Sequence, residues 1–226
     1  MSMKEGEKKL ESQWEETKID MNAVDWRGNT IHLKNVPAIK NKNTGRICVY
    51  PTEVAKAEIR MMAEQYSLES RDVPLLLMLF ARFGPAQEGR IQYKYHINKM
   101  LFYQWKEMQK QGFGEAFIPD EFEAAPRGPV PKNLGKDLKR LEKKGLVSLS
   151  YEKWGKGPKE ASLITTLTSE GKRIAAKLSG KVLEPLNEVT VEVKKQLLLL
   201  DPQTICEKVH KEYPEYRKIY VELDRD

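Results

Sequence analysis

Apolar and polar residues alternate in the N-terminal third of the chain with the period of strands. Residues 30–36 and 46–50 follow this period, and residues 41–45 between them are rich in turn formers. These three segments predict a β-hairpin. A helix is expected to follow from Pro51 to about Tyr66, because apolar side chains recur there on one face.

The first 25 residues hold few apolar side chains among many charged ones. Their spacing fits an amphipathic helix that packs on a partner, and it also fits a flexible arm. Of these two interpretations, the arm is preferred.

From residue 72 onward the apolar spacing is mostly helical. Residues 74–81 are apolar almost throughout, which indicates a helix surrounded by core, and Asp72 suits its N-cap. Two alternating segments, 146–151 and 161–167, predict a second hairpin. The expected helices cover residues 72–83, 89–110, 132–144, 168–178, 182–200 and 202–213.

The order helix, helix, helix, hairpin, helix is that of a winged helix-turn-helix. We therefore expect a mainly α fold with small β, built as a winged helix-turn-helix with an extra N-terminal β-hairpin and C-terminal helices. The expected parts are a flexible or partner-packing arm (1–25), a β-hairpin plus helix (26–71), a winged-helix DNA-binding domain (72–180) and a C-terminal helical extension (181–226).

Positive charge is concentrated in one part of the chain. The 226 residues carry a net charge of +6. Residues 127–159 alone hold ten basic and three acidic residues, and so carry +7. A focal positive patch of this kind is typical of a surface that meets phosphate.

The helix expected at 132–144 has two distinct faces. Leu134, Leu138 and Leu141 form an apolar stripe, and lysines at the same spacing lie opposite. A solvated helix face is the ordinary alternative, but like charges repel, and few acids are present here to relieve them. The candidate DNA-binding residues are Arg127, Lys132, Asn133, Lys136, Lys139, Arg140, Lys143, Lys144, Lys153, Lys156 and Lys159.

These candidates suit different contacts with double-stranded DNA. A helix fits the major groove, where Asn133 can pair with adenine and Arg140 with guanine or phosphate. The lysines suit phosphate contacts, which hold the protein on DNA without reading sequence. The basic tip of the second hairpin suits contact with a neighbouring phosphate backbone or minor groove. Trp154 in this tip either covers a sugar edge or packs beneath the tip, and packing is the preferred interpretation.

Residues 134–147 follow the pattern L-x-x-L-x-x-L-x-x-x-G-L-[IV] without strict spacing, and residues 167–172 read L-T-S-E-G-K. In both segments the chain resembles winged-helix transcription regulators of the MarR and PadR kind, over roughly residues 72–178. The resemblance implies a cytoplasmic, prokaryotic transcription regulator that binds double-stranded DNA as a homodimer. The flanking N-terminal segment and C-terminal helices would then form the dimer contacts, although the apolar positions of 191–200 suit an intramolecular core equally well.

A second, looser resemblance leaves another function open. Residues 97–103, 127–130 and 213–216 are similar to poorly characterised prokaryotic winged-helix-like proteins, antitoxin-like relatives among them. Those relatives usually carry an aromatic residue where this chain has Arg127. This resemblance implies a protein-interaction module, antitoxin-like or adaptor-like, whose basic face meets an acidic protein partner instead of DNA.

Other classes of function find little support in the sequence. The chain has neither a P-loop nor a nucleophile elbow, and its two cysteines and three histidines lack close metal-ligand spacing. His96 fits a satisfied, partly buried side chain better than a catalytic base. We therefore expect no enzyme, cofactor, metal or membrane contact, and cysteine usage and the absence of a signal peptide favour the cytoplasm.

Overall fold

The computed structural model describes residues 13–24, 30–81, 90–91, 94–112, 121–153, 161–178 and 184–217. Within these ranges it has seven α-helices and three small antiparallel sheets, with about 52% of residues helical and 27% in strands. The helices are α2 (Pro51–Gln65), α3 (Asp72–Phe80), α4 (Lys94–Lys110), α6 (Leu134–Lys143), α7 (Ser169–Leu178), α8 (Glu184–Leu197) and α9 (Pro202–Glu212), followed by the 3-10 turn η2 (Pro214–Tyr216).

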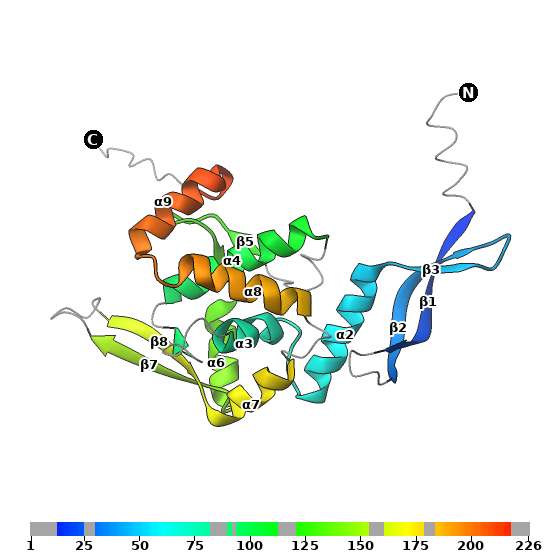
Figure 1. Ribbon diagram of the computed structural model, residues 1–226, viewed down its shortest axis with the longest axis horizontal. Coiled ribbons are helices and arrows are strands. Elements are labelled where there is room, and N and C mark those ends of the chain that lie inside the picture. Colours follow the sequence, from blue (N-terminus) through cyan, green and yellow to red (C-terminus); the bar gives the residue numbers. More distant parts are fainter. Residues whose placement is uncertain are drawn as a thin grey trace, which may run out of the picture.

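A three-stranded sheet at one end of the molecule holds the N-terminal part of the chain (Figure 1). The long strands β1 (Trp14–Val24) and β2 (Thr30–Asn41) are antiparallel, and β3 (Ile47–Val49) pairs with the other side of β2. Helix α2 covers one face of this sheet and closes a small core of its own around Leu33 and Val36.

The main core surrounds helix α3. Residues 72–79 of α3 are all buried, and α4, α7 and α8 pack around them (Figure 1). The prediction that residues 74–81 would lie inside the protein is confirmed except at Phe80, which is half-buried. Asp72, however, does not cap the helix by its side chain; Arg71 is the N-cap residue, and no side-chain hydrogen bond caps this end.

The other two sheets are small. Strand β8 (Ala161–Leu167) lies between β7 (Val147–Lys153) and β4 (Arg90–Ile91), and β5 (Phe122–Glu123) pairs with β6 (Val130–Pro131). The segment after β8 is tightly built: the Thr168 hydroxyl accepts from the Gly171 amide at 3.0 Å, and a Cβ on Gly171 would lie 1.9 Å from the Leu146 carbonyl oxygen. Glycine is required there because the helix start approaches the neighbouring backbone so closely.

The expected fold class, mainly α with small β in a winged helix-turn-helix, is wrong. The described residues form a mixed α/β structure with three antiparallel sheets, and their arrangement is not clearly that of a winged helix. The expectation rested on α6, β7, β8 and α7, whose positions it predicted closely. It missed the pairing of β4 with β8, and it treated residues 14–24 as an arm although they form the edge strand β1.

His96 is a core side chain: it is 3% exposed, and its Nε2 lies 2.9 Å from the Leu200 carbonyl oxygen. In the apolar C-terminal run, Val193 and Leu197 are buried in the main core, whereas Leu199 is 67% exposed. None of the described helices is both long enough and apolar enough to cross a membrane.

A buried lysine closes the C-terminal end of α3. The Lys194 side chain enters from α8 and is fully buried, and its Nζ donates to the carbonyl oxygens of Met78 at 3.0 Å, Leu79 at 3.2 Å and Ala81 at 2.7 Å. The last carbonyls of a helix have no partner within the helix, so a buried helix end needs a donor from elsewhere. Burial lowers the pKa of Lys194 to about 8.

We expect Lys194→Met to lower the free energy of unfolding by about 2 kcal/mol at pH 7, because three buried carbonyls lose their donor. The cost should rise by about 1 kcal/mol at pH 9, since the folded pKa lies below the usual value and the unfolded state then binds more protons. Urea unfolding at both pH values measures this. Lys195→Met, on the exposed side of α8, is the control and should shift little; equal effects of the two variants would contradict the assignment.

Candidate nucleic-acid interface

Helix α6 divides the basic residues of the chain between two environments. Leu134, Leu138 and Leu141 are buried, as the apolar stripe predicts, and Lys136, Lys139 and Lys143 point outward. The two acids of the helix, Asp137 and Glu142, determine what charge the outer face keeps.

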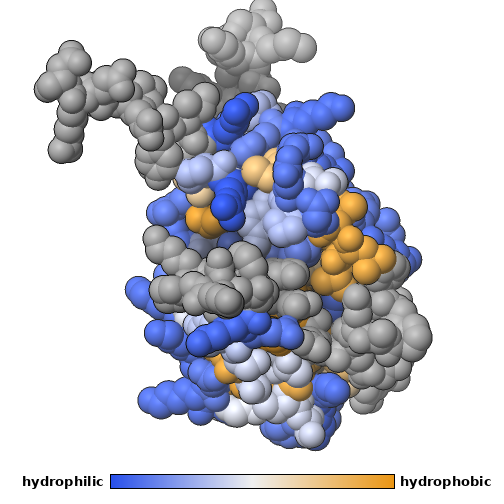
Figure 2. Space-filling model, turned by 90° about the vertical axis from the view of Figure 1, so that its left-hand side faces the viewer, coloured by the Kyte–Doolittle hydropathy of each residue, from blue (hydrophilic) through white to orange (hydrophobic). Residues whose placement is uncertain are grey.

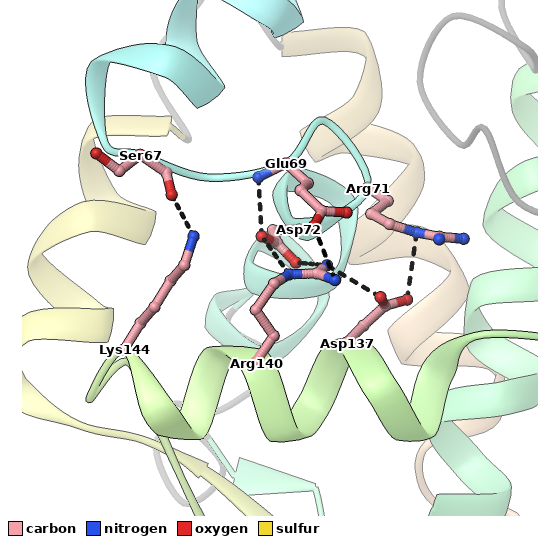
Figure 3. Close-up of polar contacts among 7 residues, drawn as sticks. All are labelled: Ser67, Glu69, Arg71, Asp72, Asp137, Arg140 and Lys144. Carbon is pink, nitrogen blue, oxygen red and sulfur yellow. Dashed lines mark hydrogen bonds and ion pairs between the residues drawn. The ribbon is translucent and has the colours of Figure 1, made fainter.

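A cluster of ion pairs anchors α6 to the turn that precedes α3 (Figure 3). Arg140 lies between three carboxylates: its guanidinium is 2.5 Å from Asp72, 2.9 Å from Asp137 and 3.1 Å from Glu69. Asp72 and Asp137 are almost fully buried, at 0% and 3% exposure. Carboxylates in such surroundings stay charged only beside a cation, so Arg140 has a structural task.

Two other candidates belong to the same anchor. Arg71 lies 3.3 Å from Asp137, and the Asn133 amide, with its oxygen turned toward this guanidinium, accepts from both terminal nitrogens at 3.2 Å. Lys144 donates to the Ser67 carbonyl oxygen (Figure 3). Asn133 and Arg140, the two side chains expected to read bases, are thus engaged inside the protein.

The outer face of α6 keeps an uncompensated row of lysines. Lys136, Lys139 and Lys143 are exposed and form no ion pair within the described part of the chain. Asp137 is taken up by Arg71 and Arg140, and Glu142 accepts from the Leu149 amide at 3.2 Å. Both acids of the helix are thereby directed away from the row, so its positive charge remains available to a ligand.

The structure adds one residue that the sequence analysis missed. Lys94, the exposed first residue of α4, has its Nζ 3.7 Å from the position that a Cβ on Gly135 would occupy. It therefore lies beside the first turn of α6 and extends the row toward that end. No local pattern could indicate this, because the two helices meet only in the folded chain.

The remaining candidates have varied positions. Lys132 is paired with Glu121 and Glu123, and the hydrogen bond to Glu121 raises its pKa, so its charge is largely compensated. Arg127 is exposed, and its carbonyl accepts from the Tyr95 hydroxyl at 3.3 Å. Lys153 is exposed at the end of β7. Lys156, Lys159 and Trp154 lie outside the described residues.

The end of the molecule toward which the β7–β8 hairpin points is mostly hydrophilic. Among the described residues on this face, Figure 2 shows mainly blue and pale side chains, with an orange patch at one side. Lys153 is at this end of β7, and the exposed Tyr151 (73%) precedes it by two residues on the same strand face. A charged end with one aromatic side chain suits contact with a polyanion.

Replacement of Arg140 by Gln should destabilise the protein much more than replacement of Lys139 by Gln. We expect Arg140→Gln to lower the free energy of unfolding by about 3 kcal/mol, because two buried carboxylates lose their main cation. Lys139→Gln should stay within about 0.5 kcal/mol of the wild type, as exposed substitutions usually do. Urea unfolding compares the two neighbours, and a similar small effect of both would show that the cluster does not anchor α6.

Comparison with known proteins does not place the chain in a family: no family model matches it, and no curated protein matches it in sequence.

Proposed function

We propose that this protein binds double-stranded DNA through the lysine row of Lys94, Lys136, Lys139 and Lys143, with Lys153 on the neighbouring hairpin. The observation that supports this most is the separation of charges on α6. Its acids are held by protein groups, while three of its lysines have no described counterion. Like charges on one face of a helix repel one another, and an anion that binds there relieves this repulsion, so binding is favourable.

The contacts proposed here are with phosphates. Along an α-helix, Lys136 and Lys143 are about 10.5 Å apart on the axis, with Lys139 between them, which is enough to follow two or three phosphates. Phosphate contacts hold a protein on the duplex without reading its sequence. Because Asn133 and Arg140 are engaged elsewhere, transcription regulation would need sequence preference from DNA shape, which such contacts allow.

The alternative is an interaction module whose lysine row meets an acidic protein. The same observation favours it, since a row of lysines without base readers suits any regular polyanion. A homodimer also remains a prediction; two copies would double the number of phosphate contacts. Salt dependence and competition between duplex DNA and an acidic polypeptide distinguish the two partners.

Replacement of three lysines of the row should reduce both affinity and its dependence on salt. For Lys136→Gln, Lys139→Gln and Lys143→Gln combined, we expect the slope of log K against log salt to flatten by about three units if each lysine contacts one phosphate. Fluorescence anisotropy with a labelled duplex of random sequence measures this at several salt concentrations.

A matched control removes the same charge from other surfaces. Lys40, Lys195 and Lys211 are exposed on β2, α8 and α9, and their combined change to Gln should leave most of the slope in place. If both triple variants lose the same affinity, only net charge matters and the proposed surface is wrong. A different result would support the alternative: neither the wild type nor the variants bind duplex DNA, whereas the wild type binds an acidic polypeptide and the triple variant of the lysine row does not.

Binding should differ little between DNA sequences of similar shape. We expect unlabelled duplexes of scrambled sequence and equal composition to compete within about threefold of one another, because the expected base readers are engaged and phosphate contacts are independent of sequence. A competitor preferred by a hundredfold or more would show that base contacts exist outside the described residues or that Asn133 and Arg140 leave their partners.

A further inference from the structure

A cysteine and a histidine lie side by side on α9, away from the lysine row. Cys206 and His210 are one helical turn apart, and the thiol Sγ is 3.7 Å from the imidazole Nδ1. Side chains four residues apart share one face of a helix, so this pair is held together by the helix itself. A nucleophile beside a base is the arrangement from which thiol reactivity arises.

Helix α4 brings two further groups to this thiol. Burial first, and then the proximity of Cys206, raise the pKa of Tyr95, whose hydroxyl donates to the Arg127 carbonyl oxygen at 3.3 Å. Lys99 is fully buried nearby, with its Nζ donating to the Pro129 carbonyl oxygen at 2.7 Å and lying 4.9 Å from the centre of the Tyr95 ring. Burial lowers the pKa of Lys99 to about 7, so its amine is partly neutral at neutral pH. Tyr95 and Lys99 thus lie near the face of α9 that carries Cys206, and His210 is the group in direct contact with the thiol.

The surroundings of His210 favour the neutral imidazole, which is the form that can accept a proton. Burial lowers the pKa of His210, and the positive charges of Arg217 and Lys99 lower it further, so the neutral ring is favoured at neutral pH. Its Nε2 is buried and has no hydrogen-bond partner within the part of the chain that the structure describes. Nδ1, which faces the thiol, is therefore the nitrogen with an immediate partner.

We infer that Cys206 is a reactive thiol and a site of modification by small electrophiles, with hydroperoxides as the natural class. In the proposed step His210 takes the thiol proton, and the sulfur attacks one oxygen of the hydroperoxide. The O–O bond breaks, the leaving alkoxide or hydroxide receives the proton, and a sulfenic acid and an alcohol or water result. Sulfur is oxidised, and the peroxide supplies the oxidant.

Its partial exposure limits what can reach Cys206. The thiol is half-buried between α4 and α9, which favours small neutral reagents over bulky ones. This site is independent of the lysine row, so its test is independent of DNA binding.

Cys48 provides a control inside the same molecule. It lies on β3 and is also half-buried, but within the described residues its side chain has no hydrogen-bond or ion-pair partner. The two thiols therefore share a similar exposure class and differ in their neighbours. Any difference in their reaction rates at one pH reports on those neighbours.

The rates of both cysteines can be measured in a single sample. The folded chain is treated with a limiting amount of iodoacetamide at pH 7, and peptide mass spectrometry follows the alkylation of each cysteine. We expect Cys206 to react about tenfold faster than Cys48. Hydrogen peroxide followed by dimedone should then label Cys206 as the sulfenic acid in preference to Cys48.

Two outcomes would overturn the inference. One is a Cys206 rate in the folded wild type that equals or falls below that of Cys48, and this comparison requires no variant. The other is a His210→Gln variant that keeps the wild-type rate at Cys206. We expect that variant to lose about tenfold at Cys206 with no change at Cys48, whose unchanged rate also shows that the fold persists.

Discussion

Helix α3 is enclosed by protein on nearly all sides, and both of its ends therefore need polar partners from other elements. At the N-terminal end Asp72 is held by Arg140 of α6, and at the C-terminal end three carbonyls are held by Lys194 of α8. Each contact brings a charge into the core, where it is tolerated only because its partners are there as well. The arrangement of α6 and α8 around α3 follows from this constraint.

The anchor of α6 also determines which charges face solvent. Asp137 and Arg140 turn toward α3 and neutralise each other together with Asp72 and Arg71, so they add little to the field outside. Lys136, Lys139 and Lys143 lie on the outer side of α6, and Asp137, which stands between them in the sequence, does not share that side. A structural ion-pair cluster and an exposed lysine row are thus two consequences of one helix orientation, and the first increases the net charge of the second.

Much of this structure could be predicted because its signals are local. Strand β8 was expected at its observed bounds, and α6 within two residues, since each has a strict period and clear ends. Strand β1 was not expected, because its apolar residues are few and half-buried. The two-residue strand β4 exists only through its pairing with the distant β8, and β5 and β6 are too short to show a period of their own. The fold class failed for this reason.

The candidate site shows the same limit at the level of single side chains. Arg140 and Lys139 are neighbours of the same charge, and the sequence gives no ground for separating them. What separates them is Asp72, sixty-eight positions earlier in the chain, which reaches Arg140 and not Lys139. Because Lys136, Lys139 and Lys143 make no described contact that folding requires, evolution can change them with little cost in stability. On α6 the residues that hold the fold and those available for binding are therefore distinct, and each set can be altered without the other.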